Sequence, residues 1–157
     1  MPQGDPQILE ALNGILTAEL TAINQYFVHA KMCENWGFQR LYKKKWEESV
    51  EEMKDADRII ERILYLEGVP NMQRHSPVRV GEHAIEQHQL DLAMELEAVQ
   101  RYNAAIALCQ EKNDAGTREL LEHHLKEEEE SVDWLESQLY LVEKVGAEQY
   151  LAEQISA

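Results

Sequence analysis

Four long stretches of this sequence carry apolar residues in steps of three and four, and each has a glutamate within its apolar stripe. Such spacing is typical of amphipathic helices that turn one face toward a core. An ionised carboxylate in a dry core is costly unless it is paired or binds a metal. The four acids therefore need a common explanation; they are Glu19, Glu52, Glu95 and Glu128.

The breaks between these stretches indicate where the helices begin and end. Asp5 and Pro6 are suited to begin the first helix, and Gly37 is suited to end it after Trp36. Asn113–Gly116 reads as a short turn, so the last two long helices should be antiparallel. The expected helices span about 6–36, 39–67, 82–112 and 117–146, with a short fifth helix over about 147–155.

Residues 68–82 contain glycine, proline, asparagine and serine without a helical period, and this segment is long for a helix connection. A second helix of about 28 residues would be about 42 Å long. About 14 extended residues reach roughly the same distance. The segment can therefore run the length of the bundle. The sequence predicts an all-α, ferritin-like four-helix bundle with one long crossover between helices two and three, formed by a single domain over 1–157.

Composition argues against several classes of partner. The chain of 157 residues has 30 acidic and 15 basic residues and a formal charge of −15, which argues against nucleic acid or anionic membranes as partners. We find no signal peptide and no apolar run long enough for a membrane span, so we expect a cytoplasmic protein. Cys33 and Cys109 are too few for a disulfide framework and should be reduced.

The spacing of the four glutamates strengthens the case for a shared site. Glu52 follows Glu19 by 33 residues, and Glu128 follows Glu95 by 33 residues. A two-fold arrangement of the helices would bring the acids to one level of the core, where four carboxylates suit iron or manganese. Any one of these glutamates, taken alone, is more simply explained as an exposed acid on an acidic protein.

Known di-metal bundles take a glutamate from each of two helices and a Glu-x-x-His motif from each of the other two. The corresponding tetrads here are Glu52–Asp55 and Glu128–Ser131, and neither ends in histidine. Asp55 could still ligate a metal through oxygen, whereas Ser131 is a poor ligand. His123 and His124 lie about one turn before Glu128; His124 could approach the core, but the surface is the favoured position for both.

Several short runs carry a specific likeness to a known family. They are ELTAINQYF (19–27), EMK (52–54), ADR (56–58), ERIL (61–64), EGVPN (67–71) and DWLE (133–136). Through these runs the sequence resembles the bacterioferritins over essentially its whole length. The resemblance implies a hollow cage of 24 subunits built from two-fold dimers, which stores ferric mineral, binds haem b between paired subunits and receives electrons from a ferredoxin-type donor.

The resemblance also implies roles for single residues. The four glutamates match the di-iron carboxylates of the family, and Asp55 and Ser131 fall where the family has its two histidine ligands. Met53 matches the axial methionine of the haem. Met53 could instead fill a gap in the core, but it shares a second apolar stripe of its helix with Trp46 and Val50, which favours a surface shared with a partner.

Three hypotheses follow. In the first, the chain is a storage subunit that binds haem through Met53 and has a weakened ferroxidase centre, which leaves room for co-assembly with a ferroxidase-competent subunit. In the second, Asp55 and the four glutamates form a modified, carboxylate-only di-iron ferroxidase. In the third, the chain is a structural helical assembly protein without a cofactor. We rank them in this order, with the first two close.

Overall fold

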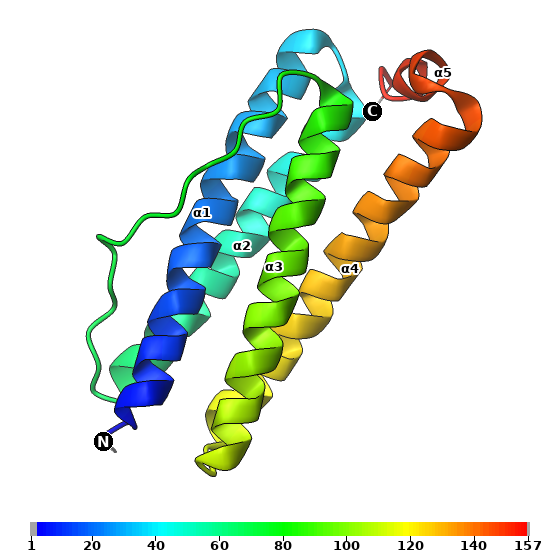
Figure 1. Ribbon diagram of the computed structural model, residues 1–157. Helices are drawn as coiled ribbons and strands as arrows, with labels where there is room; N and C mark the ends of the chain where they lie inside the picture. Colours follow the sequence, from blue (N-terminus) through cyan, green and yellow to red (C-terminus); the bar gives the residue numbers. More distant parts are fainter. Residues whose placement is uncertain (1–2, 157) are drawn as a thin grey trace.

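The computed structural model describes residues 3–156 and contains four long helices that lie side by side, with a short fifth helix across one end (Figure 1). This arrangement confirms the predicted all-α, ferritin-like bundle with its short C-terminal helix. The helices are α1 (Pro6–Trp36), α2 (Gln39–Tyr65), α3 (Ala84–Glu111), α4 (Ala115–Val145) and α5 (Ala147–Ala152).

The helix ends follow local capping. The Asp5 side chain accepts a hydrogen bond at the start of α1, and Gly37 ends that helix in the left-handed conformation with φ 86°. α2 ends two residues earlier than predicted because Glu67 takes a left-handed φ of 62°. α3 begins two residues later than predicted because the His83 side chain caps it by accepting a hydrogen bond from the Glu86 N–H.

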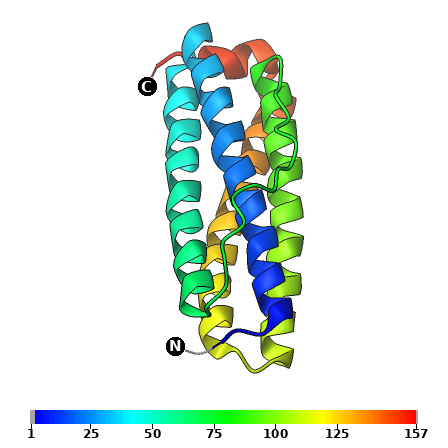
Figure 2. The same ribbon diagram turned by 90° about the vertical axis from the view of Figure 1, so that its left-hand side faces the viewer.

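Residues 66–83 form the long crossover, which runs along the bundle beside α1 and reaches the opposite end before α3 begins (Figure 2). This confirms the predicted connection. Side chains of α1 hold the crossover at successive points along its path. The Asn71 N–H donates to Asn13 Oδ1 at 2.7 Å. The Arg79 N–H donates to Gln25 Oε1 at 3.1 Å, and the Gly81 N–H donates to His29 Nε2 at 2.9 Å.

The main apolar core lies in the half of the bundle away from α5, where Leu12, Ile59 and Leu121 are fully buried. The buried face of α3 carries mostly small or polar side chains. Ala98 and Ala105 are buried, whereas the larger apolar residues Leu92, Val99 and Ile106 are half-buried. Small side chains on the inner face let α3 lie close to its neighbours and turn the larger ones toward its flank.

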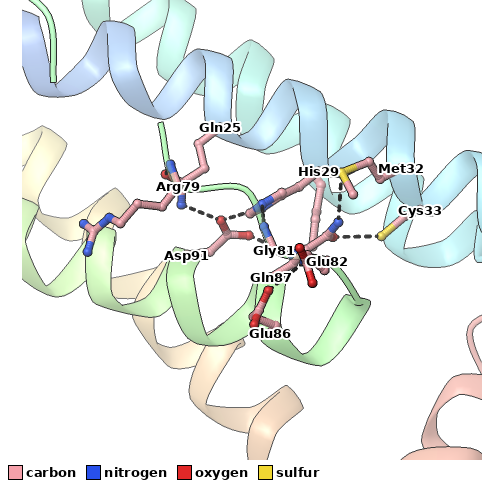
Figure 3. Close-up of polar contacts among 11 residues, drawn as sticks. Gln25, His29, Met32, Cys33, Arg79, Gly81, Glu82, Glu86, Gln87 and Asp91 are labelled. Carbon is pink, nitrogen blue, oxygen red and sulfur yellow. Dashed lines mark hydrogen bonds and ion pairs between the residues drawn. The ribbon is translucent and has the colours of Figure 1, made fainter. Parts of the chain in front are cut away.

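A second buried group is polar and joins three helices and the crossover. Asp91 of α3 accepts hydrogen bonds from Gln25 Nε2 and His29 Nδ1 of α1, both at 2.9 Å (Figure 3), and pairs with Lys45 Nζ of α2 at 2.7 Å. All four side chains are buried, and we call them the Asp91 cluster. Burial would raise the pKa of Asp91, but the Lys45 ammonium and the His29 hydrogen bond outweigh it and hold the pKa at about 2.

The outward face of α2 carries an exposed apolar stripe. Its members include Trp46, Val50, Met53 and Leu64, and Met53 is 59% exposed. The ring of Phe27 from α1 packs edge-on against Trp46 with 5.5 Å between centroids, which extends the apolar surface onto α1. We call this surface the α2 stripe. Among the described residues, no helix is long and apolar enough to cross a membrane.

Candidate metal centre

Four of the predicted acids come together in the core. Glu19, Glu52, Asp55 and Glu128 each offer a carboxylate oxygen, and these oxygens all lie within 4.8 Å of one another. All four side chains are buried. The apolar stripe of each helix forces its central acid inward, so the pattern that buries the helix also delivers the carboxylate to this point.

Glu95 is buried beside this group and lines the same cavity as Glu19 and Glu128, although it lies outside the tightest set. We call the five carboxyl groups the acid site. A cavity of about 360 Å³ reaches it between α1 and α3, below the crossover, with Arg79 and Arg101 in its lining. A second cavity of about 290 Å³ reaches Glu52, Asp55 and Glu128 from between α2 and α4.

The acid site is poorly satisfied by protein groups alone. Within residues 3–156, the Oε2 atoms of Glu19, Glu52 and Glu95 are buried without a hydrogen-bond partner. Burial and mutual repulsion raise the pKa of Asp55 to about 10 and that of Glu128 to about 8. Such an arrangement holds protons at neutral pH and would release them to solvent when a cation binds the carboxylates.

His124 lies next to the acid site, which corrects the preference for a surface position and agrees with the alternative that it approaches the core. It is 1% exposed, whereas His123 is exposed as predicted. His124 Nε2 lies 3.6 Å from Asp55 Oδ1, and its Nδ1 lies 3.5 Å from the Tyr102 hydroxyl. Because His124 is four residues before Glu128, it occupies the same face of α4, and this spacing was the signal available in the sequence.

The Tyr102 hydroxyl contacts both His124 and Glu19 of the acid site. The hydroxyl donates a hydrogen bond of 2.6 Å to Glu19 Oε1. Burial, the nearby His123 and Arg58 together lower the pKa of His124 to about 4. His124 is therefore a neutral imidazole at physiological pH, the form that ligates metals.

Ser131 is buried at the α2–α4 side of the site, but its hydroxyl is engaged elsewhere. Ser131 Oγ donates to Glu48 Oε2 at 3.0 Å, and Lys44 Nζ pairs with the other oxygen of Glu48 at 3.0 Å. Glu48 is half-buried and lines the second cavity with Glu52, Asp55 and Glu128, and each of its two carboxylate oxygens has a partner. This end of the site offers carboxylate oxygens and one serine hydroxyl.

The remaining candidate residues lie apart from the acid site. Met53 follows Glu52 on α2 yet faces outward on the α2 stripe, as its helical rotation predicts. Cys33 and Cys109 are buried free thiols, and burial raises the pKa of each to about 11. Cys33 donates a hydrogen bond to Gln87 Oε1 at 3.2 Å, which is a structural contact near the Asp91 cluster (Figure 3).

Comparison with known proteins agrees with this architecture. The profile of the ferritin-like domain family matches residues 9–145. A protein named bacterioferritin from Mycolicibacterium paratuberculosis is 49% identical over 154 residues, which cover 98% of this chain and 97% of that protein. A protein of the same name from Mycobacterium leprae is 49% identical over 98% of this chain and 97% of its own length. One from Streptomyces coelicolor is 46% identical over 96% of this chain and 90% of its own length.

Proposed function

The chain belongs to the bacterioferritin family, and from this premise we propose that it is an iron-storage subunit of a haem-containing cage whose own ferroxidase centre is degenerate. The observation that carries the proposal is the acid site, with carboxylate oxygens of four residues within 4.8 Å of one another in the core. Iron is the substrate and cargo in this proposal. The acids would bind it, and the cage would store it as ferric mineral.

The acid site fits a hard cation. Carboxylate oxygens suit iron and manganese, and three buried Oε2 atoms have no hydrogen-bond partner in the described part of the chain. A bound divalent cation would accept these lone pairs and displace the protons that the raised pKa values retain. Two cavities that both contact Glu52 and Glu128 give ions access to the acids from opposite sides of the bundle.

The degenerate character is proposed from the two positions where the family resemblance places histidines. Asp55 has a shorter side chain than histidine, and Ser131 directs its hydroxyl to Glu48. The Ser131 end of the site is thereby left without a nitrogen ligand. A pair of ferrous ions would be held less firmly there, so we expect slow oxidation by this subunit alone and co-assembly with a subunit that retains the histidines.

Stopped-flow oxidation of Fe²⁺ at two ions per subunit tests this proposal. The protein should lack a rapid two-iron phase, and the double variant Asp55→His with Ser131→His should oxidise Fe²⁺ at least about tenfold faster. Asp57→His with Ser137→His, at exposed positions of the same two helices, is the matched control. A rapid, stoichiometric phase in the unmodified protein would contradict the degenerate centre and support an active carboxylate-only ferroxidase.

We also propose that Met53 binds haem b at a two-fold interface. The support is an exposed thioether on the α2 stripe, flanked by the apolar side chains of Trp46 and Val50. Paired subunits would each supply one Met53, and the bound haem would serve as a one-electron carrier fed by a ferredoxin-type donor. A Soret band that Met53→Leu abolishes and Met72→Leu retains would support this role; Met72 is a similarly exposed methionine of the crossover.

The α2 stripe also supports assembly into two-fold dimers, and through them a cage of 24 subunits. Exposed apolar surface of this kind is usually covered by a partner in the assembled protein. Native mass spectrometry of the cage isolated from its source would show whether a second type of subunit is present. A cage made of this chain alone would contradict co-assembly, though not storage.

A further inference from the structure

His124 is the one imidazole beside the acid site among the described residues, and it stands outside the Glu-x-x-His pattern. It reaches the site from one turn before Glu128 on α4, so its ring enters beside Asp55 instead of at Ser131. The ring is 1% exposed and packs edge-on against Tyr102, with 6.2 Å between ring centroids. A fully buried imidazole in this position needs an explanation that the family pattern does not provide.

The neighbours of His124 determine which of its ring nitrogens carries the lone pair. The Tyr102 hydroxyl gives its hydrogen to Glu19, so the hydroxyl oxygen is left to face His124 Nδ1 as an acceptor. Nδ1 then carries the imidazole hydrogen, and Nε2 carries the lone pair. That lone pair faces Asp55 Oδ1 at 3.6 Å.

A nitrogen and an oxygen lone pair at this separation are suited to share a metal ion. Two ligands of one metal with bonds of about 2.1 Å lie roughly 3.0–3.4 Å apart in octahedral or tetrahedral geometry. The gap of 3.6 Å between Nε2 and Oδ1 is only slightly wider. Oxygens of Glu19, Glu52 and Glu128 lie within 4.8 Å of one another and of an Asp55 oxygen, so they can complete the sphere.

We propose that His124 Nε2 and Asp55 Oδ1 ligate the same divalent metal ion, which makes the acid site asymmetric. The inference rests on the proposed binding of metal at the acid site and adds its nitrogen ligand. One metal position, beside Asp55 and His124, has mixed nitrogen and oxygen ligation suited to Fe²⁺. The opposite position, beside Glu95 and Ser131, has oxygen ligands alone.

Pulsed electron paramagnetic resonance of the Mn²⁺-loaded assembly tests this ligand set. Bound Mn²⁺ should show a ¹⁴N coupling that becomes a ¹⁵N coupling when only histidine is labelled with ¹⁵N, a result that needs no substitution. The coupling should disappear in His124→Leu and persist in His123→Leu, the adjacent exposed histidine. His124→Leu should also weaken Mn²⁺ binding at least about tenfold, measured by loss of the free-ion signal.

The outcomes separate this inference from the proposed function. Mn²⁺ that binds, is lost in Glu128→Gln, and shows no histidine coupling would overturn the role of His124 and leave the acid site intact. The same conclusion follows if the coupling survives in His124→Leu. Mn²⁺ binding that is indifferent to Glu128→Gln would overturn metal binding at the acid site itself, and the inference with it.

Discussion

Asp91 and Glu95 lie one turn apart on α3, and both carboxyl groups are buried, yet their surroundings differ in kind. Asp91 meets an ammonium group, an imidazole and an amide, and its pKa falls to about 2. Glu95 meets other acids, keeps an oxygen without a hydrogen-bond partner in the described chain, and has its pKa raised well above the ordinary value by burial and by Glu128.

This difference separates two uses of a buried charge. In the Asp91 cluster the protein supplies every partner, so the charge is internally compensated and holds α1, α2, α3 and the crossover in register. In the acid site the protein supplies acceptors without enough donors, so compensation must come from protons or from a cation. A buried group that its own chain leaves unsatisfied is a stronger indicator of ligand binding than burial alone.

The largest effect should follow from breaking the Asp91 cluster. Asp91→Ala leaves the Lys45 ammonium buried without its partner, which should cost about 3–5 kcal/mol of stability. At about 2–4 °C per kcal/mol, the thermal midpoint followed by circular dichroism should fall by roughly 6–20 °C.

Lys54→Ala is the control for this substitution because Lys54 pairs with Glu51 on the exposed surface. Its effect should stay below about 1 kcal/mol. Equal losses in the two variants would mean that the Asp91 cluster contributes no more than a surface pair.

A smaller effect should appear in how the stability of the metal-free assembly depends on pH. The folded pKa values of Asp55 and Glu128, about 10 and about 8, lie above their ordinary values of 3.8 and 4.5. The native state therefore holds protons that the unfolded chain has released, and stability falls as pH rises through this window. Asp91 acts in the opposite sense, because its contribution to stability is lost as the pH falls from about 4 toward 2.

Chemical unfolding in the presence of a chelator, from about pH 5 to about pH 9, measures this dependence. Glu128→Gln should make the stability fall less steeply with pH. It removes one carboxyl group that keeps its proton in the native state and loses it in the unfolded chain. Bound Mn²⁺ should make the stability fall less steeply as well. A metal-free assembly that becomes more stable over the same range would show that the acids are compensated by the protein after all.

The smallest effect should come from Ser131→Ala. This substitution removes one hydrogen bond to Glu48, which keeps its ion pair with Lys44, so the loss should be about 0.5–1.5 kcal/mol. Thermal unfolding under the conditions used for Asp91→Ala gives the comparison. A loss as large as that of Asp91→Ala would make Ser131 a major structural contact and would weaken its interpretation as a lost ligand position.

Much of this architecture could be predicted from the sequence because it depends on patterns within single helices. The period of the apolar stripes located the four helices, the composition of 68–82 indicated the crossover, and the mid-stripe position of the glutamates predicted that they converge. The exposure of Met53 followed from its rotation relative to Glu52. Apart from the two-fold arrangement that brings the glutamates to one level, these features need no knowledge of which helix lies beside which.

The features that were missed depend on contacts between helices. Lys45 reads as the last member of a lysine run, and its burial makes sense only once Asp91 of α3 faces it. His124 sits in a polar stretch beside an exposed histidine, and its role depends on Tyr102 and Asp55 from two other helices. Helical period could place each on an inward face, but it could not name the partner.

The crossover has a consequence for how the chain reaches its native state. α1 with α2, and α3 with α4, are hairpins of neighbouring segments, so each can form from local contacts that favour fast folding. The two halves are tethered by residues 66–83. Loop closure costs grow only slowly with length, so a tether of this size adds little to the barrier for docking. We therefore expect the two hairpins to form first and to dock in a later step, when Asp91 of α3 pairs with Lys45 of α2 and His29 of α1.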